Sequence, residues 1–155
     1  MGSSRTHHLD GLEATRHLGA RLAAVLAPGD AVLLTGDLGA GKTTLARAVI
    51  AQLCGIEDAP SPTYTLVQVY DTDAGDEVWH ADLYRIEDPS ELDELGLDDA
   101  FDTAICLVEW PDRLGGRLPP DRLEILLSGE NTDLESGRKA RITGYGRWEE
   151  RVDDI

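Results

Sequence analysis

The spacing of hydrophobic positions predicts that helices and strands alternate along most of the chain. Residues 12–26 carry leucine and valine at helical intervals, and the Pro-Gly-Asp sequence at 28–30 ends this helix. An apolar run at 31–35 is typical of a strand. Residues 42–53 repeat leucine and valine at i, i+4 and i+8, which predicts a second helix.

The middle of the chain changes to a period of two. Two prolines exclude helix from the loop at 59–64. Residues 65–70 and 78–83 then predict an antiparallel hairpin around an acidic turn at 71–77. Strand alternation puts three polar side chains on one face of the second strand: His80, Asp82 and Tyr84.

The second half contains an apolar run without alternation, residues 104–108, which is typical of a parallel strand covered on both faces. A short helix is expected at 90–95, and strands at 123–128 and 139–145. The whole pattern predicts an α/β fold of the P-loop NTPase type, with a mostly parallel central sheet flanked by helices and an antiparallel hairpin.

Length and composition favour one globular domain. The chain has 155 residues, of which 41% are hydrophobic and 28% charged. We assign the domain to residues 12–146, and expect residues 1–11 to be flexible, since they begin like the remnant of an expression tag. Residues 147–155 are expected to be a loose tail. We see no membrane span and no secretory segment.

The most informative motif is GDLGAGKTT at residues 36–44, which matches the phosphate-binding pattern G-x-x-x-x-G-K-[ST]. It follows a predicted strand and opens a predicted helix, as this chemistry requires. Backbone N–H groups of such a loop cradle phosphates, and the helix N-terminus adds positive potential. Lys42 can reach the β- and γ-phosphates, and the Thr43 hydroxyl can ligate Mg²⁺. The motif predicts a nucleotide site.

Two carboxylates and one threonine are candidates for the rest of the site. Glu109 ends the apolar strand at 104–108, where open α/β sheets gather their ligands, and could hold Mg²⁺. Asp82 could orient the attacking water or hold a metal-bound water. Alternatively, it is only a charged residue on a solvated face of the hairpin. Thr63 could contact the γ-phosphate or its Mg²⁺, as switch threonines do, or it could be an ordinary turn residue. His80 by itself is more typical of a structural residue.

The charge is strongly negative, at −16 from 14 basic and 30 acidic residues. Residues 71–102 hold thirteen of the acidic residues and one basic residue. This stretch is either a solvated acidic face or a surface that binds a partner. This balance argues against nucleic-acid binding by the chain alone. The two cysteines, Cys54 and Cys106, do not suggest a disulfide framework, so we expect a reducing cytoplasm.

Five motifs occur in the order found in the TsaE family, the bacterial ATPases of tRNA threonylcarbamoyladenosine biosynthesis. They lie at residues 36–44, 61–67, 80–85, 94–97 and 107–111. The chain resembles this family from about residue 12 to residue 141. The resemblance implies a small P-loop fold that binds ATP and Mg²⁺ and acts with a TsaB–TsaD protein pair, which modifies the adenosine beside the anticodon.

By the same resemblance, Lys42, Asp82 and Glu109 are catalytic, and Thr43 and Glu109 hold the metal. Asp82 is implied to be needed for hydrolysis, and Trp110 to lie near a switch or contact surface. The nucleotide-binding residues implied are Thr15, Asp37, Leu38, Gly39, Ala40, Gly41, Lys42, Thr43, Thr44 and Arg138.

Two other functions fit a P-loop chain of this size. A small-molecule kinase needs an acceptor pocket and usually an arginine-bearing lid, for which only Arg113, Arg117 and Arg122 are placed in a suitable loop. A GTP-operated switch would carry an Asn-Lys-x-Asp motif to read the base, and the sequence has none. We therefore favour the ATPase.

Overall fold

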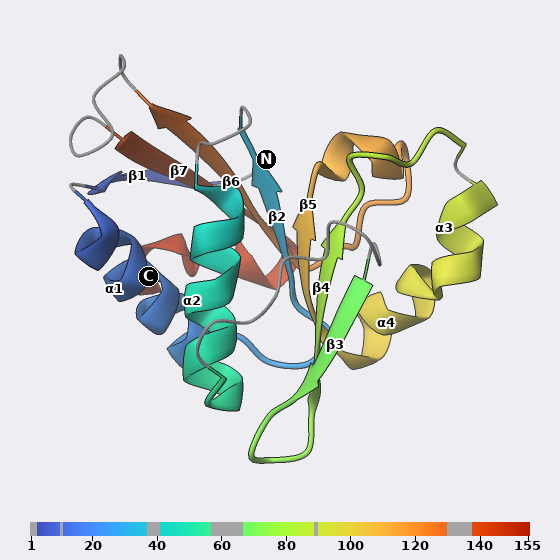
Figure 1. Ribbon diagram of the computed structural model, residues 1–155. Coiled ribbons are helices and arrows are strands. Elements are labelled where there is room, and N and C mark those ends of the chain that lie inside the picture. The colour runs from blue at the N-terminus through green and yellow to red at the C-terminus, as the bar shows by residue number, and fades with distance from the viewer. Residues whose placement is uncertain (1–2, 10, 37–40, 57–66, 89, 130–137) are drawn as a thin grey trace.

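The computed structural model describes residues 3–9, 11–36, 41–56, 67–88, 90–129 and 138–155. Within these residues, seven strands form one sheet with helices on both faces (Figure 1). The strands are β1 (Ser3–Leu9), β2 (Ala31–Thr35), β3 (Val67–Asp71), β4 (Glu77–Asp82), β5 (Ile105–Glu109), β6 (Arg122–Gly129) and β7 (Arg138–Tyr145). The helices are α1 (Leu12–Val25), α2 (Lys42–Cys54), α3 (Ser90–Leu95) and α4 (Leu97–Thr103).

The strand order is β1-β7-β6-β2-β5-β4-β3. The four central strands β6, β2, β5 and β4 are parallel, whereas β3, β7 and β1 pair antiparallel with their neighbours. This confirms the predicted α/β class, the mostly parallel sheet and the β3–β4 hairpin. The register places Glu109 of β5 between Leu34 of β2 and Asp82 of β4, so the carboxyl ends of three strands meet at one point.

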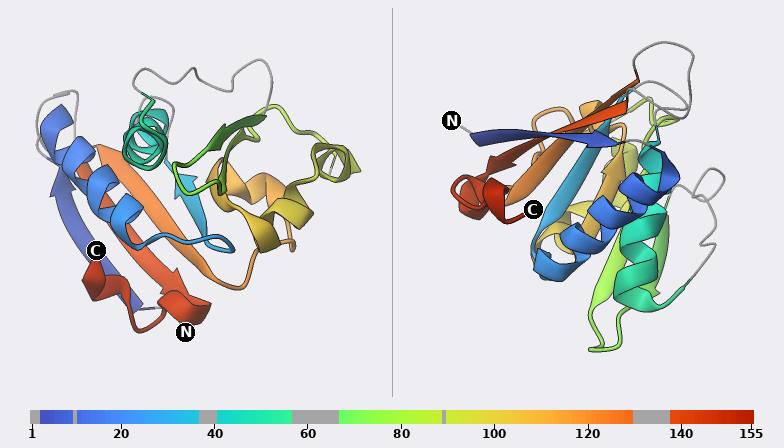
Figure 2. Two further views of the ribbon diagram at one scale, coloured as in Figure 1. Left: turned by 90° about the horizontal axis from the view of Figure 1, so that it is seen from below. Right: turned by 90° about the vertical axis from the view of Figure 1, so that its left-hand side faces the viewer.

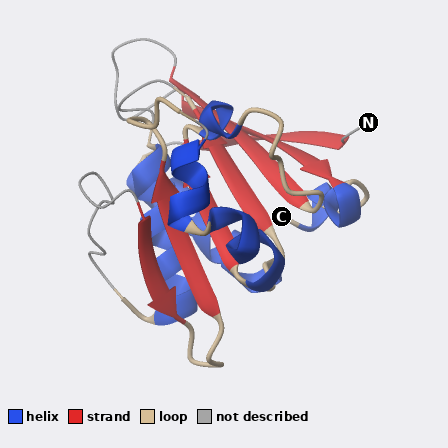
Figure 3. Cartoon of the chain, turned by 90° about the vertical axis from the view of Figure 1, so that its right-hand side faces the viewer, coloured by secondary structure: helices blue, strands red, loops and turns tan. Residues whose placement is uncertain are grey.

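Two hydrophobic cores lie on opposite faces of the sheet. On one face, α1 and α2 pack Leu22 and Val49 against strand residues such as Leu107. On the other face, the shorter α3 and α4 cover Leu33 and Val108 (Figures 2 and 3). Because β2 and β5 are covered on both sides, their residues are continuously apolar, as the sequence pattern indicated.

The N-terminal segment differs from the expectation of a flexible end. Residues 3–9 form the edge strand β1, which pairs with β7 along its whole length. Ser4 Oγ lies 2.9 Å from Thr143 Oγ1, and Leu9 is buried in the core under α1. Because this edge has one solvated face, most of its residues are polar, and the sequence therefore carried little strand signal.

The C-terminal segment is also packed, where a loose tail was expected. Trp148 and Ile155 are fully buried, and Val152 lies with them in the core that α1 covers. Two 3-10 turns, Gly146–Trp148 and Val152–Asp154, shape the segment. Trp148, Val152 and Ile155 follow helical spacing at i, i+4 and i+7, but a run of eight residues is too short for that spacing to predict an element by itself.

Helix α4 was not predicted as a separate element. The expected helix ended at Gly96, and Gly96 does end α3, in a left-handed conformation at φ 75°. The chain then continues as a second short helix, which buries Leu97, Ala100 and Phe101. None of the described helices is long and apolar enough to cross a membrane.

Candidate functional site

The phosphate-binding motif lies between β2 and α2, as the sequence predicted. Gly41 precedes α2 in a left-handed conformation with φ 101°, which glycine adopts without strain. Lys42 is the first residue of the helix and is only 4% exposed; its ammonium donates a hydrogen bond to the Gly36 carbonyl. The predicted phosphate contacts Asp37, Leu38, Gly39 and Ala40 lie outside the described residues.

Thr43 and Glu109 meet across the site. The Thr43 hydroxyl donates a hydrogen bond of 2.8 Å to Glu109 Oε1. Glu109 is the last residue of β5 and is 2% exposed, so its carboxylate is held almost out of solvent. These two residues are 66 positions apart, and the β2–β5 register brings them together. A hydroxyl and a carboxylate so placed are the oxygen ligands that Mg²⁺ takes in phosphate sites.

The second oxygen of Glu109 contacts His80. His80 is fully buried in β4, and its Nε2 lies 2.7 Å from Glu109 Oε2. The carboxylate is therefore held on both sides. Strand alternation predicts His80 on the same face as Asp82, and the spacing of two residues between them is the sequence signal for a role of His80 at the site, beyond the structural one expected of it.

Asp82 lies beside Glu109 at the end of β4. Its Oδ1 accepts a 3.0 Å hydrogen bond from the Tyr84 backbone N–H, which fixes the side chain. Burial raises the pKa of Asp82 above its ordinary value, and the negative charge of Glu109 adds to the rise. The Tyr84 N–H, His80 and Lys42 act in the opposite direction on that pKa. The three predicted catalytic residues are thus electrostatically coupled.

The side chain of Trp110 lies over Lys42. The Lys42 ammonium lies 4.0 Å from the centroid of the Trp110 ring. The Tyr84 ring packs against the Trp110 ring, with 4.9 Å between the two centroids. Among the described residues, Trp110 is the only non-glycine with positive φ, at 59°. A bulky residue in this conformation is strained, and such strain gathers at functional sites. Its N–H donates to the Leu34 carbonyl at 3.3 Å, which helps hold the turn.

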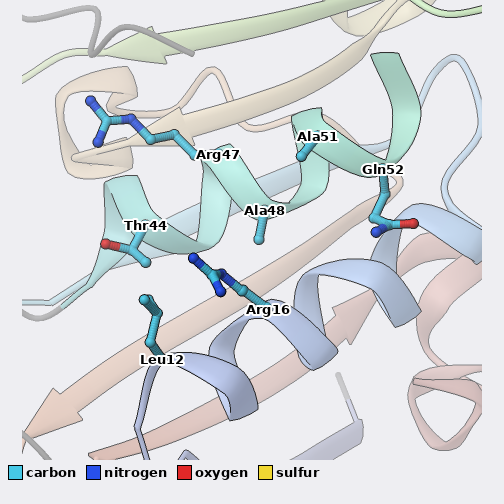
Figure 4. A pocket seen from close by; sticks show the side chains of 7 residues that line it. All are labelled: Leu12, Arg16, Thr44, Arg47, Ala48, Ala51 and Gln52. Atoms are coloured by element: carbon cyan, nitrogen blue, oxygen red, sulfur yellow. The ribbon is translucent and has the colours of Figure 1, made fainter. Parts of the chain in front are cut away.

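A cavity of about 550 Å³ lies in the groove between α1 and α2 and is lined at one point by Thr44, the residue after Thr43. In Figure 4, Leu12 and Arg16 of α1 face Thr44 and Ala48 of α2. The predicted nucleotide residue Thr44 therefore lines this cavity. The other predicted residue of this region, Thr15, is buried on α1 at 5% exposure and is not part of the lining.

Two further predicted site residues are Arg138 and Thr63. Arg138 is the first residue of β7, opposite Leu9 of β1 and Gly129 of β6. Thr63 lies outside the described residues. The described residues contain no group of three or more histidine, cysteine, aspartate or glutamate side chains placed to hold a metal. A metal here would thus need ligands from a bound phosphate, as in other P-loop sites.

Comparisons with known proteins agree with this geometry. A family model described as "Threonylcarbamoyl adenosine biosynthesis protein TsaE" matches residues 9–140. A protein of Rickettsia felis, named tRNA threonylcarbamoyladenosine biosynthesis protein TsaE, is 41% identical over 120 residues, which cover 77% of this chain and 70% of the relative. The protein of the same name from Streptomyces coelicolor is 36% identical over 138 residues, covering 86% of this chain and 93% of the relative.

A solved structure supports the same relationship. The crystal structure of YdiB from Bacillus subtilis superposes with a TM-score of 0.79 and is 30% identical in sequence. The match covers 99% of this chain and 94% of that one. The fold, the P-loop context and the family match over most of the length therefore agree, and the chain belongs to the TsaE family of tRNA threonylcarbamoyladenosine biosynthesis proteins.

Proposed function

We propose that this chain binds and hydrolyses ATP with Mg²⁺, and that this ATPase serves threonylcarbamoylation of the adenosine beside the anticodon in tRNA. The observation that carries the proposal is the meeting of the P-loop with a buried carboxylate: Lys42 and Thr43 open α2, and Thr43 hydrogen-bonds Glu109 at 2.8 Å. A P-loop that only shaped a turn would not need this carboxylate buried against it.

Thr43 and Glu109 would hold Mg²⁺, with the remaining ligands from phosphate and water. When bound, the ion neutralises charge on the phosphate oxygens. Lys42, which now contacts the Gly36 carbonyl and the Trp110 ring, would turn its ammonium to the β- and γ-phosphates. The helix N-terminus at Lys42 adds a favourable potential for the same anion.

Asp82 would orient the attacking water. It pairs with Glu109 on the neighbouring strand, and the Tyr84 N–H fixes its side chain. Asp82 is only partly buried, so water can reach it from solvent. Burial raises the pKa of Asp82, which makes its carboxylate a better proton acceptor than that of an ordinary aspartate.

The nucleoside end of ATP would enter the groove between α1 and α2, because Thr44 follows directly on the phosphate-binding Thr43. Leu12 is 53% exposed and offers an apolar surface for the base, and Arg16 lies on the same wall. We therefore assign the adenine contact expected of Thr15 to these two residues. We expect Leu12→Asp to weaken ATP binding and to leave binding of inorganic triphosphate unchanged.

The partners would be a TsaB–TsaD protein pair, and the compartment the cytoplasm. A net charge of −16 opposes direct contact with tRNA, so other subunits would hold the RNA. The isolated chain would be a slow ATPase, because parts added in trans can accelerate phosphoryl transfer by a factor of about 10³ or more. The described cysteines are free thiols, which is compatible with a reducing compartment.

The kinase alternative is less well supported by the described residues. Arg117 is paired with Asp93 and Asp98 on the opposite face of the sheet from α2. Arg122 contacts Glu124 and stacks on Tyr145. Two of the three arginines considered for a lid are thus already engaged elsewhere.

Three variants test the ATPase. Lys42→Ala should weaken ATP binding by about ten- to a hundredfold, since a charge-assisted contact contributes about 1.5–3 kcal/mol. Glu109→Ala should weaken binding only when Mg²⁺ is present. Asp82→Ala should bind ATP and stop hydrolysis. Unchanged ATP binding in Lys42→Ala would remove the assignment, and loss of binding in Asp82→Ala with hydrolysis in Glu109→Ala would reverse the two roles.

The partner proposal is tested separately. ATP hydrolysis is measured with and without the TsaB–TsaD pair, and a gel shift measures tRNA binding by the chain alone. We expect strong stimulation and no shift at physiological salt. Fast ATP hydrolysis that the partner pair does not change would contradict the partner proposal. Tight tRNA binding that weakens with salt would contradict it as well.

A further inference from the structure

We propose that His80 is a positioning residue that holds the Glu109 carboxylate in its metal-binding orientation. The inference rests on the proposed function, because it concerns the same Mg²⁺–nucleotide site. It gives a role to a buried polar side chain that neither the P-loop motif nor the proposed ligands use.

The burial of His80 calls for an explanation. Its side chain is fully buried on β4, where it lies opposite Leu107 of β5 and Gln68 of β3. An apolar side chain would fill such a position without the free-energy cost of burying a polar ring. Among the described residues Nδ1 has no hydrogen-bond partner, whereas Nε2 contacts Glu109 Oε2 at 2.7 Å. The ring is therefore directed to one acceptor.

The geometry of Glu109 explains what this contact does. Oε1 accepts from Thr43 and Oε2 from His80, so hydrogen bonds fix both oxygens of the carboxylate. An ionised carboxylate only accepts, so the proton lies on Nε2 of His80. Without His80, one of the two anchors is lost, and the carboxylate can rotate about its terminal bond. His80 thus acts through Glu109 and touches no phosphate itself.

Outer hydrogen-bond partners of metal ligands typically change metal affinity by about 10- to 100-fold when they are removed. A residue that only fills space would change the stability of the fold and leave the Mg²⁺ dependence of nucleotide binding unaltered. The two roles are therefore separable by measuring both quantities.

Two substitutions form a matched pair. The amide nitrogen of His80→Gln can reach the place of Nε2, whereas that of His80→Asn is one bond shorter and matches Nδ1. Affinity for a non-hydrolysable ATP analogue is measured by calorimetry in Mg²⁺ and in EDTA. We expect His80→Asn to lose about tenfold affinity in Mg²⁺ and none in EDTA, and His80→Gln to recover most of the loss. His17→Asn, an exposed histidine on α1, is the control.

The outcomes are distinct. If wild type gains affinity with Mg²⁺ and His80→Asn gains equally, the positioning role is wrong and the proposed function stands. If wild type itself gains nothing from Mg²⁺, both the proposed function and this inference fail.

A measurement on wild type covers the case in which His80→Asn does not fold. The chain has four histidines, and proton–nitrogen NMR reports which ring nitrogen carries a slowly exchanging proton. We expect one imidazole protonated at Nε2 with slow exchange, and loss of that signal in Glu109→Ala. Absence of the signal, or its persistence in Glu109→Ala, would overturn the contact on which the inference depends.

Discussion

The ammonium of Lys42 lies over the ring of Trp110, 4.0 Å from its centroid, and donates a hydrogen bond to the Gly36 carbonyl. The lysine that the P-loop motif assigns to phosphate is thus already partnered within the protein. Trp110 itself has a left-handed backbone conformation, with φ 59°. Nucleotide binding has to compete with these contacts, and this competition leads to the first prediction.

Replacement of Trp110 by leucine should strengthen ATP binding. The change removes the cation–π contact, of about 0.5–1 kcal/mol, and keeps an apolar side chain over the site. We expect about two- to fivefold tighter binding of ATP by calorimetry in EDTA, because Lys42 is then released at lower cost. A tenfold loss of affinity would instead mean that the ring holds Lys42 in the position that binds phosphate.

The raised pKa of Asp82 gives a stability effect with a defined sign. A carboxyl whose pKa is raised by folding favours the protonated form, so its ionisation destabilises the fold as pH rises through the unfolded and then the folded pKa. Asp82→Asn keeps the oxygen that accepts from Tyr84 and removes this ionisation.

We therefore expect Asp82→Asn to be more stable than wild type at neutral pH, with the difference shrinking as pH falls below the pKa of an ordinary aspartate. Thermal unfolding of the nucleotide-free chain at a series of pH values measures it. Glu77→Gln, an exposed acid on the same strand, is the control. A difference that grows toward acid pH would show that the environment of Asp82 lowers its pKa.

The contact between Asp30 and the C-terminal segment should contribute strongly to stability. Asp30 is 1% exposed and accepts from Arg147 Nε at 2.6 Å, from Trp148 Nε1 at 3.0 Å and from the Ala27 N–H at 2.8 Å. Arg147→Met leaves this buried carboxylate without its counter-charge, which should lower the free energy of unfolding by about 3 kcal/mol. Urea unfolding measures the change.

Arg151→Met is the control for that experiment. Arg147 and Arg151 both lie over the Trp148 ring, each 4.7 Å from its centroid, but the ion pair of Arg151 with Asp154 is exposed. We expect a change of less than about 1 kcal/mol in this variant. Equal effects of the two substitutions would mean that aromatic stacking, and not the Asp30 ion pair, holds the segment.

Helices α1 and α2 approach closely at Gly19. A methyl group at this position would lie 2.5 Å from Ala48 Cβ and 3.1 Å from the Ala48 carbonyl carbon. Gly19→Ala should therefore destabilise the fold by about 1–3 kcal/mol, measured by urea unfolding. Gly116→Ala is the matched control, because an added methyl there meets open space. A neutral Gly19→Ala would show that the two helices can separate without cost.

Local patterns were sufficient to predict the P-loop between a strand and a helix, the hairpin, and the central strand that ends at Glu109. In these segments the residues that form an element are adjacent in sequence: glycines allow the loop, and continuous apolar residues mark a strand covered on both faces. For the same reason Lys42, Thr43, Asp82 and Glu109 could be selected as candidates, and the family could be inferred from the order of its motifs.

Contacts between distant segments were decided only by the tertiary structure. Strand β1 depends on pairing with β7, and the C-terminal segment depends on burial of Trp148, Val152 and Ile155 in the core, so a short local pattern did not predict the packing of either. The contacts of Glu109 with Thr43 and His80 likewise follow from the register of β2, β5 and β4. Register is set by how whole strands pack, because a shift of one residue would turn every side chain to the other face.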